Sequence, residues 1–232
     1  MKITVLNAEP LSYIINQINT RKALFTGMKS YRTVKQRASA EFTEKKSVFI
    51  GCISPVSDEA AAKSFISEIK KCHPDATHNV FAYILEGTEI ARFSDDGEPQ
   101  GTAGMPVLEV LKREGLCGVA AVVTRYFGGT LLGAGGLVRA YAKAAKMAVD
   151  AAGICEFRPF TEFRLTVEYT YYEKIKKELE PRGIKLDGCD FGEKVVFDLA
   201  AETEAFDSFK DFVSDFTGAS AFFEKTGERF DA

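Results

Sequence analysis

Two glycine-rich segments in the first two-thirds of the chain constrain its fold more than any other feature. One runs from Arg92 to Pro106 with the sequence RFSDDGEPQGTAGMP, and the other runs from Thr124 to Tyr141 with the sequence TRYFGGTLLGAGGLVRAY. Each segment leaves an apolar stretch and enters a helical pattern. Because glycine costs backbone entropy, this density indicates turns with positive φ or a backbone that something approaches closely. A helix that begins after such a loop presents free N–H groups, which suit an anion.

The composition is that of an ordinary globular protein with room for two domains, at 232 residues with 46% hydrophobic and 27% charged side chains. No apolar run approaches the ~20 residues of a membrane span, and no secretory signal is recognisable at the start. The five cysteines are widely spaced without a C-x-x-C pair. Three of them, Cys52, Cys117 and Cys155, lie in or beside apolar stretches, which predicts small core residues in a reducing cytoplasm.

The formal net charge is −3, and acidic residues outnumber basic ones in the last third of the chain. A protein-wide positive field that would attract nucleic acid is therefore absent. Any nucleic-acid binding would need a local basic surface.

The first domain is expected at residues 28–153, with α and β elements in mixed order. Strands are predicted near 31–39, 48–53 and 118–124, and the segments 79–85 and 88–93 should form a hairpin. Ser57 is expected to cap a helix. The apolar spacing predicts a long helix over 135–152, whose inward face is Leu137, Tyr141, Ala144, Ala145 and Ala148. Residues 1–27 lack such a period, so we expect a leader outside the functional protein, which would start at Met28.

Residues 154–159 are interpreted as a linker, and residues 160–232 as a second domain. In that domain the alternation of apolar residues predicts the order β-α-β-β-α-β. This order is the ferredoxin-like arrangement, a scaffold with many functions. The predicted fold class is thus α+β in two domains.

Several carboxylates and two histidines are candidate ligands or catalytic groups. Asp95, Asp96 and Glu98 would suit a hard cation or a catalytic carboxylate pair, or form a solvated turn. His73 and His78 are the only histidines. With Cys72 they would offer three metal ligands, although they flank a proline in a loop.

The second glycine-rich segment carries a set of basic and aromatic side chains. Arg125, Arg139, Lys143 and Lys146, together with Tyr126 and Phe127, have the character of an RNA-contacting surface or of a solvated helix face. The loop lacks the lysine of a Walker A motif, but the stretch 132–136 resembles the phosphate loop of some small-molecule kinases. Glycines that serve only tight turns and close helix–sheet packing are the other interpretation.

Both long motifs, 92–106 and 123–141, resemble the signature of the IMPACT family, most closely its bacterial YigZ-like branch. The resemblance covers residues 28–232. It implies a first domain with the ribosomal protein S5 domain 2-like fold and a second, ferredoxin-like domain, similar to the last domains of elongation factor G. Eukaryotic relatives act as translation regulators through an additional domain that this chain lacks. The resemblance implies no catalytic residues.

The sequence therefore predicts a translation-associated regulator in the cytoplasm that binds the ribosome, RNA or a translation protein, without a cofactor, metal or membrane. The alternatives are a nucleotide-dependent phosphotransferase that uses the 128–136 loop and a protein-binding module. The expected nucleic-acid or partner surface is made of the motif residues Arg92, Asp95, Asp96, Glu98, Gly101, Arg125, Tyr126, Phe127, Gly128, Gly129, Gly133, Gly135, Gly136, Arg139, Lys143 and Lys146.

Overall fold

The chain forms two compact units, which a computed structural model describes over residues 2–5 and 30–231. The first unit contains Tyr31–Phe157 together with the strand β1, and the second begins at Arg158. Nearly all of the expected leader, residue 1 and residues 6–27, lies outside the described residues. Its one described element is β1 (Lys2–Val5), which pairs with the following sheet strand.

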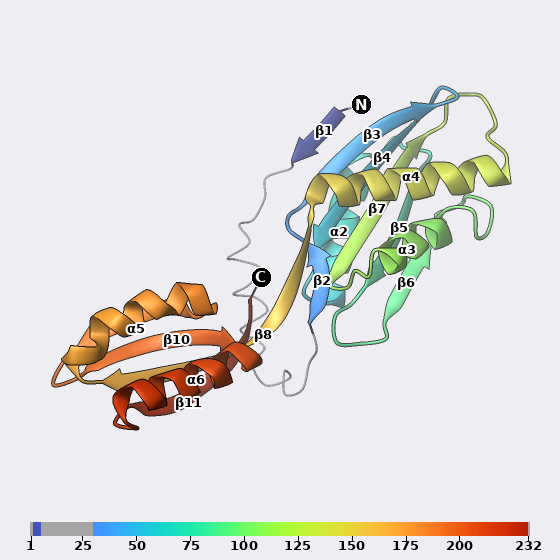
Figure 1. Ribbon diagram of the computed structural model, residues 1–232. Coiled ribbons are helices and arrows are strands. Elements are labelled where there is room, and N and C mark those ends of the chain that lie inside the picture. Colours follow the sequence, from blue (N-terminus) through green and yellow to red (C-terminus); the bar gives the residue numbers. More distant parts are fainter. Residues whose placement is uncertain (1, 6–29, 232) are drawn as a thin grey trace. The chain divides into compact units, whose positions relative to one another are not determined.

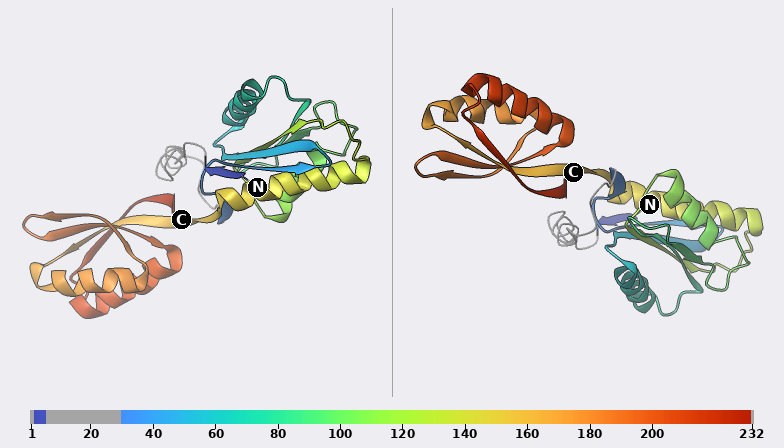
Figure 2. Two further views of the ribbon diagram at one scale, coloured as in Figure 1. Left: turned by 90° about the horizontal axis from the view of Figure 1, so that it is seen from above. Right: turned by 90° about the horizontal axis from the view of Figure 1, so that it is seen from below.

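The first unit is built on a six-stranded antiparallel sheet in the order β1-β3-β4-β7-β5-β6. Helix α2 covers one face of this sheet, and helices α3 and α4 cover the other (Figure 1, Figure 2). The strands are β3 (Ala38–Glu44), β4 (Ser47–Pro55), β5 (His78–Ile84), β6 (Ala91–Ser94) and β7 (Val119–Tyr126). The helices are α2 (Glu59–Cys72), α3 (Gly104–Arg113) and α4 (Ala134–Ala152).

Helix α4 packs against the sheet through the residues that its 3.6-residue period selects. All five residues of the expected inward face are buried, and the helix spans one residue more than predicted. Glycine permits the close approach: a Cβ on Gly51 of β4 would lie 2.3 Å from the carbonyl oxygen of Ala144. The bounds of the helices show that the first glycine-rich segment leads into α3 and the second into α4.

The second unit is a four-stranded antiparallel sheet in the order β11-β8-β10-β9, with helices α5 and α6 on one face. The chain order β8-α5-β9-β10-α6-β11 with this strand order is the ferredoxin-like fold. Its elements are β8 (Ile154–Val167), α5 (Tyr172–Leu179), β9 (Lys185–Phe191), β10 (Val195–Glu202), α6 (Thr203–Thr217) and β11 (Phe222–Asp231), with short 3₁₀ turns η2 (Tyr169–Tyr171) and η3 (Glu180–Arg182). Side chains of β8, β10 and both helices form its core.

Three sequence-based expectations about the elements were wrong. The predicted strand over 31–39 is two strands, β2 (Tyr31–Val34) and β3, with different partners: β2 pairs with the start of β8. The expected linker 154–159 lies within β8, because its first residues hydrogen-bond to β2. Asp58, and not Ser57, caps α2, since its Oδ1 accepts a hydrogen bond from the amide of Ala61 at 2.7 Å.

Candidate functional site

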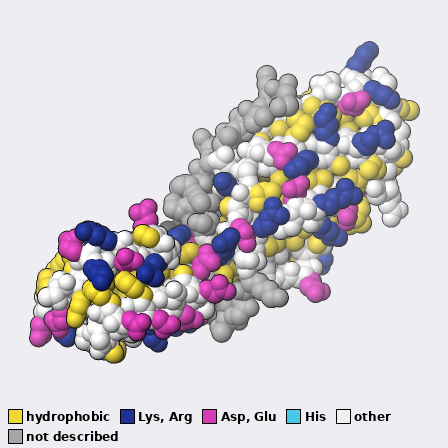
Figure 3. Space-filling model, in the orientation of Figure 1, with side chains coloured by type: hydrophobic (Ala, Val, Ile, Leu, Met, Phe, Trp, Pro, Cys, Tyr) yellow, Lys and Arg dark blue, Asp and Glu magenta, His cyan; other side chains and the backbone are white. Residues whose placement is uncertain are grey.

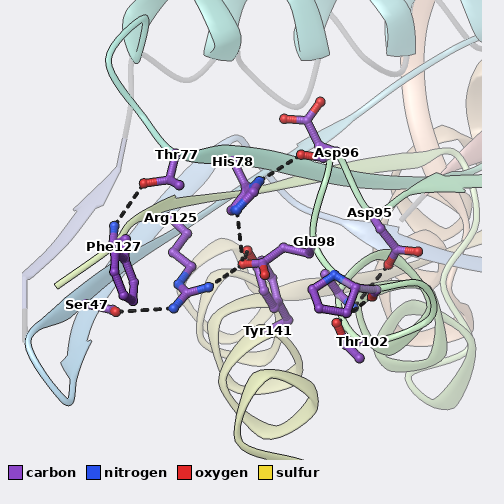
Figure 4. A network of polar contacts seen from close by, with 12 residues as sticks. Ser47, Thr77, His78, Asp95, Asp96, Glu98, Thr102, Arg125, Phe127 and Tyr141 are labelled. Carbon is purple, nitrogen blue, oxygen red and sulfur yellow. Dashed lines mark hydrogen bonds and ion pairs between the residues drawn. The ribbon is translucent and has the colours of Figure 1, made fainter. Parts of the chain in front are cut away.

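The two glycine-rich segments meet through a buried ion pair between Glu98 and Arg125. Glu98 lies in the loop before α3, and Arg125 lies near the end of β7 (Figure 4). Arg125 Nη1 lies 2.5 Å from Glu98 Oε1, and the hydroxyl of Tyr141 on α4 donates to the same oxygen at 2.7 Å. Glu98 is 8% exposed and Arg125 is 5% exposed. Three separate parts of the chain are therefore held together at one carboxylate.

Further contacts hold Arg125 in place. Its Nη2 donates to Ser47 Oγ, and its guanidinium carbon lies 5.5 Å from the ring centre of Phe49 and 5.4 Å from that of Phe127. Burial and the hydrogen bond to Glu98 raise the pKa of the Tyr141 hydroxyl far above its usual value, so it remains a donor. The expectation that Arg125 contacts phosphate at the surface is wrong, because the guanidinium is enclosed and already paired with a carboxylate.

The neighbouring acidic residues are also engaged inside the fold. Asp95 accepts hydrogen bonds from the amides of Gly101, Ala103 and Gly104, and so caps the start of α3 (Figure 4). Asp96 accepts from Lys70 Nζ at 2.8 Å and from a backbone amide of β5 at 2.7 Å. Burial opposes ionisation of Asp96, but these two hydrogen bonds outweigh it and hold the pKa of that carboxyl below its usual value. These acids, expected at a partner surface, therefore have internal structural contacts.

The two histidines do not converge on a shared site with Cys72. His73 Nδ1 lies 2.9 Å from the hydroxyl of Tyr126, and His78 Nδ1 lies 2.8 Å from the carbonyl oxygen of Asp96. Cys72 is exposed at the end of α2. In residues 2–5 and 30–231, no group of three or more His, Cys, Asp or Glu side chains has a geometry that would hold a metal ion.

The second glycine-rich loop, residues 127–133, packs on the β3–β4 turn and then starts α4. A Cβ on Gly128 would lie 2.0 Å from the carbonyl carbon of Lys46, so only glycine lets the loop rest on this turn. Gly133 is the N-cap of α4 with a φ of 71°, and the cap has no side-chain hydrogen bond. In this loop, Phe127 is 45% exposed to solvent and Leu131 is 82% exposed.

A groove lies beside the start of α4, with a volume of about 260 Å³. We call it the basic groove; its walls are Phe42, Glu44, Lys45, Leu132, Gly136, Arg139, Ala140 and Lys143. Arg139 and Lys143 project from α4, and Lys45 projects from the β3–β4 turn. Within the described part of the chain, neither these three cations nor the adjacent Lys46 has a carboxylate within ion-pairing distance.

The structure places the predicted basic residues in different environments. Arg139 and Lys143 line the basic groove as expected of a surface pair. Lys146 lies one turn further along α4 and is held by Glu114 at 2.9 Å and Asp150 at 2.6 Å. Arg92 is exposed on β6, the edge strand of the sheet, away from the groove's lining. Figure 3 shows many Lys and Arg side chains on the face of the first unit that carries α4, with several acidic side chains interspersed among them.

Sequence reasoning missed Lys45, the cation on the opposite wall of the groove, and its neighbour Lys46. The one signal that could point to them is the polar stretch Glu44-Lys45-Lys46-Ser47 between two apolar runs, but it lacks the Asn-Gly or Asp-Gly pair that is typical of a tight hairpin turn. Both lysines have positive φ, 46° and 67°, as a two-residue turn of this hand requires. Lysine in that conformation is uncommon.

The fold and site define a two-domain α+β protein in which an S5 domain 2-like unit precedes a ferredoxin-like unit. The family model described as Impact N-terminal domain matches residues 45–149, and a domain of unknown function, DUF1949, matches residues 165–220. The chain belongs to the IMPACT family. It is 41% identical over 193 residues to the IMPACT family member YvyE of Bacillus subtilis, covering 83% of this chain and 89% of YvyE.

Two further comparisons extend over most of the chain. The IMPACT family member YigZ of Escherichia coli is 35% identical over 179 residues, which cover 76% of this chain and 88% of YigZ. A solved structure titled "Crystal structure of an hypothetical protein" matches with a TM-score of 0.55 and 32% identity, covering 86% of this chain and 98% of that one. In the described residues, no helix is long and apolar enough to cross a membrane.

Proposed function

We propose that this protein is a translation-associated regulator that binds ribosomal RNA through the basic groove. The observation that carries the proposal is the set of cations that line the groove, Lys45, Arg139 and Lys143, which have no carboxylate partner among the described residues. Unpaired cations around a concave surface favour an anionic ligand.

The start of α4 adds donors to this surface. The first N–H groups of a helix have no intrahelical acceptor, and Gly136, in the first turn of α4, lines the groove. That turn has no acidic residue and no capping side chain to compete for these donors. The positive end of the helix dipole therefore faces the same region as the three groove cations, which favours a phosphate group.

A protein with a net charge of −3 needs such a local surface to bind RNA. Repulsion between RNA and the acidic second unit would keep contact confined to the basic groove. This role places the protein in the cytoplasm with the ribosome. The carboxylates that a phosphotransferase could have used as catalytic groups, Asp95, Asp96 and Glu98, are all engaged in internal contacts.

The test is co-sedimentation of the full chain with ribosomes over a salt series. We expect association that weakens steeply with salt, because phosphate contacts release counterions. In the Arg139→Glu/Lys143→Glu variant we expect about 100-fold weaker association, since two charge-assisted contacts contribute about 1.5 kcal/mol each.

The matched control is Lys177→Glu/Lys210→Glu, which changes the net charge equally at two exposed residues of the second unit. It should associate as the wild type does. Equal loss in both double variants would show a general charge effect, and no loss in either would remove the basic groove as the binding surface.

A further inference from the structure

We infer that the RNA held at the basic groove is base-paired, and that Glu44 recognises its ribose 2′-hydroxyl. This inference rests on the proposed function and specifies the ligand of the same groove. It follows from three features: a single aromatic ring in the groove that is already packed against other side chains, cations on two opposing elements, and one unpaired carboxylate among them.

The groove has no platform for an unstacked base. Its one aromatic side chain is Phe42, whose ring stacks on Phe49 with centres 5.4 Å apart and planes 13° apart. Lys143 Nζ lies 4.3 Å from the centre of the same ring. The ring of Phe42 is thus already in contact with a phenyl ring and with an ammonium group. Proteins that bind single strands rely on successive exposed rings on which bases stack.

The nearby aromatic residues do not replace that platform. Arg125 lies against the ring of Phe127 at 5.4 Å. The ring of Tyr126 meets that of His73 edge to face, and its hydroxyl contacts the same histidine. Phe127 is therefore a single half-exposed ring, and the most exposed apolar side chain of the loop, Leu131, has no π-face. The described residues around the groove therefore offer no series of exposed rings on which successive bases could stack.

The cations instead suit the backbone of a helix. Arg139 and Lys143 are one turn apart on α4, about 6 Å along its axis, and Lys45 stands on the β3–β4 turn across the groove. A sugar–phosphate backbone projects as a ridge from a duplex, so it enters a groove and meets cations from both walls. Recognition of duplex RNA through shape and through phosphate and 2′-hydroxyl contacts needs no access to the bases.

Glu44 gives this surface a means to distinguish RNA from DNA. It is exposed, it is the one acidic residue that lines the groove, and it has no ion-pair or hydrogen-bond partner in the described part of the chain. A carboxylate beside a phosphate site weakens binding unless it accepts a hydrogen bond from the ligand. A ribose 2′-hydroxyl provides that donor next to the phosphates, and deoxyribose lacks it.

The experiment measures binding of the full chain to four probes of one sequence by fluorescence anisotropy at fixed low salt. The probes are an RNA duplex, each of its single strands, and the corresponding DNA duplex. We expect the RNA duplex to bind at least about tenfold more tightly than either single strand or the DNA duplex. For Glu44→Ala we expect tighter binding of the DNA duplex and an RNA-to-DNA affinity ratio close to one.

The outcomes separate this inference from the proposed function. Single strands that bind as tightly as the RNA duplex would overturn base pairing while leaving RNA binding intact. An unchanged RNA-to-DNA ratio in Glu44→Ala would overturn the role of Glu44. If no RNA probe binds the wild type, or if Arg139→Glu/Lys143→Glu binds the duplex as the wild type does, the proposed function itself fails.

Discussion

Replacing Arg125 with alanine should lower the free energy of unfolding by about 3–5 kcal/mol, the largest effect that we expect of any single substitution. The substitution leaves the Glu98 carboxylate, whose side chain is 4% exposed, buried without its cation. Tyr141 would still donate to it, and His78 Nε2 lies 3.8 Å from the same oxygen, but neither contact replaces the close guanidinium. Urea unfolding of the full chain, followed by circular dichroism, measures the change.

A second pair of variants distinguishes the buried charge from lost packing. Arg125→Met keeps much of the apolar stem, and the added change Glu98→Gln removes the charge while keeping an acceptor for Tyr141. We expect Arg125→Met/Glu98→Gln to be more stable than Arg125→Met alone. Arg92→Ala, at an exposed edge-strand arginine, serves as the control and should change stability by less than about 0.5 kcal/mol. A loss in Arg125→Ala no larger than in this control would contradict the buried ion pair.

The substitution Gly51→Ala should destabilise the protein by about 2–3 kcal/mol, the upper part of the range for overpacked cores. The added methyl would lie 2.3 Å from the Ala144 carbonyl oxygen and 3.3 Å from the Ala148 Cβ. The nearest obstacle is backbone, so it cannot be relieved by rotating a side chain, and α4 must move away from β4. Thermal and urea unfolding would both report the loss.

The matched control for this glycine is Gly192→Ala in the β9–β10 turn. There the nearest atom to an added Cβ is the Lys194 carbonyl oxygen at 3.9 Å. We expect a change within about 0.5 kcal/mol. Equal stability of the two glycine variants would show that α4 does not press on the sheet at Gly51.

Local patterns in the sequence predicted most of the elements of the fold. The helical period of 135–152 selected the residues of α4 that are buried, because one face of an amphipathic helix must meet the sheet. The apolar run 118–124 likewise predicted β7, the strand between β4 and β5. The family resemblance, and not the periodicity, predicted how these elements are connected in space.

The errors arose where a distant part of the chain decides the local structure. Residues 154–157 continue β8 because they pair with β2, more than 100 residues earlier, and no local signal reveals that partner. The role of Arg125 was misjudged for the same reason. An arginine is usually exposed, and its buried partner Glu98 comes from a different loop.

The glycine-rich motifs turned out to serve two purposes that their sequence does not separate. Gly128 permits close packing of the loop on the β3–β4 turn, whereas Gly133 and Gly136 shape the start of α4 beside the basic groove. Arg139 and Lys143 were predicted from helical spacing. The facing Lys45 was not, because only the folded hairpin brings it to the groove.

The measurement that tests the central claim most directly is the salt dependence of RNA binding in variants that each replace one cation with glutamine. In a plot of log association constant against log salt, the slope counts the phosphates neutralised by the protein. We predict that Arg139→Gln and Lys143→Gln each reduce this slope by about one, and that Lys210→Gln on α6 leaves it unchanged. Identical slopes in the wild type and all three variants would contradict a role for the basic groove in holding phosphate.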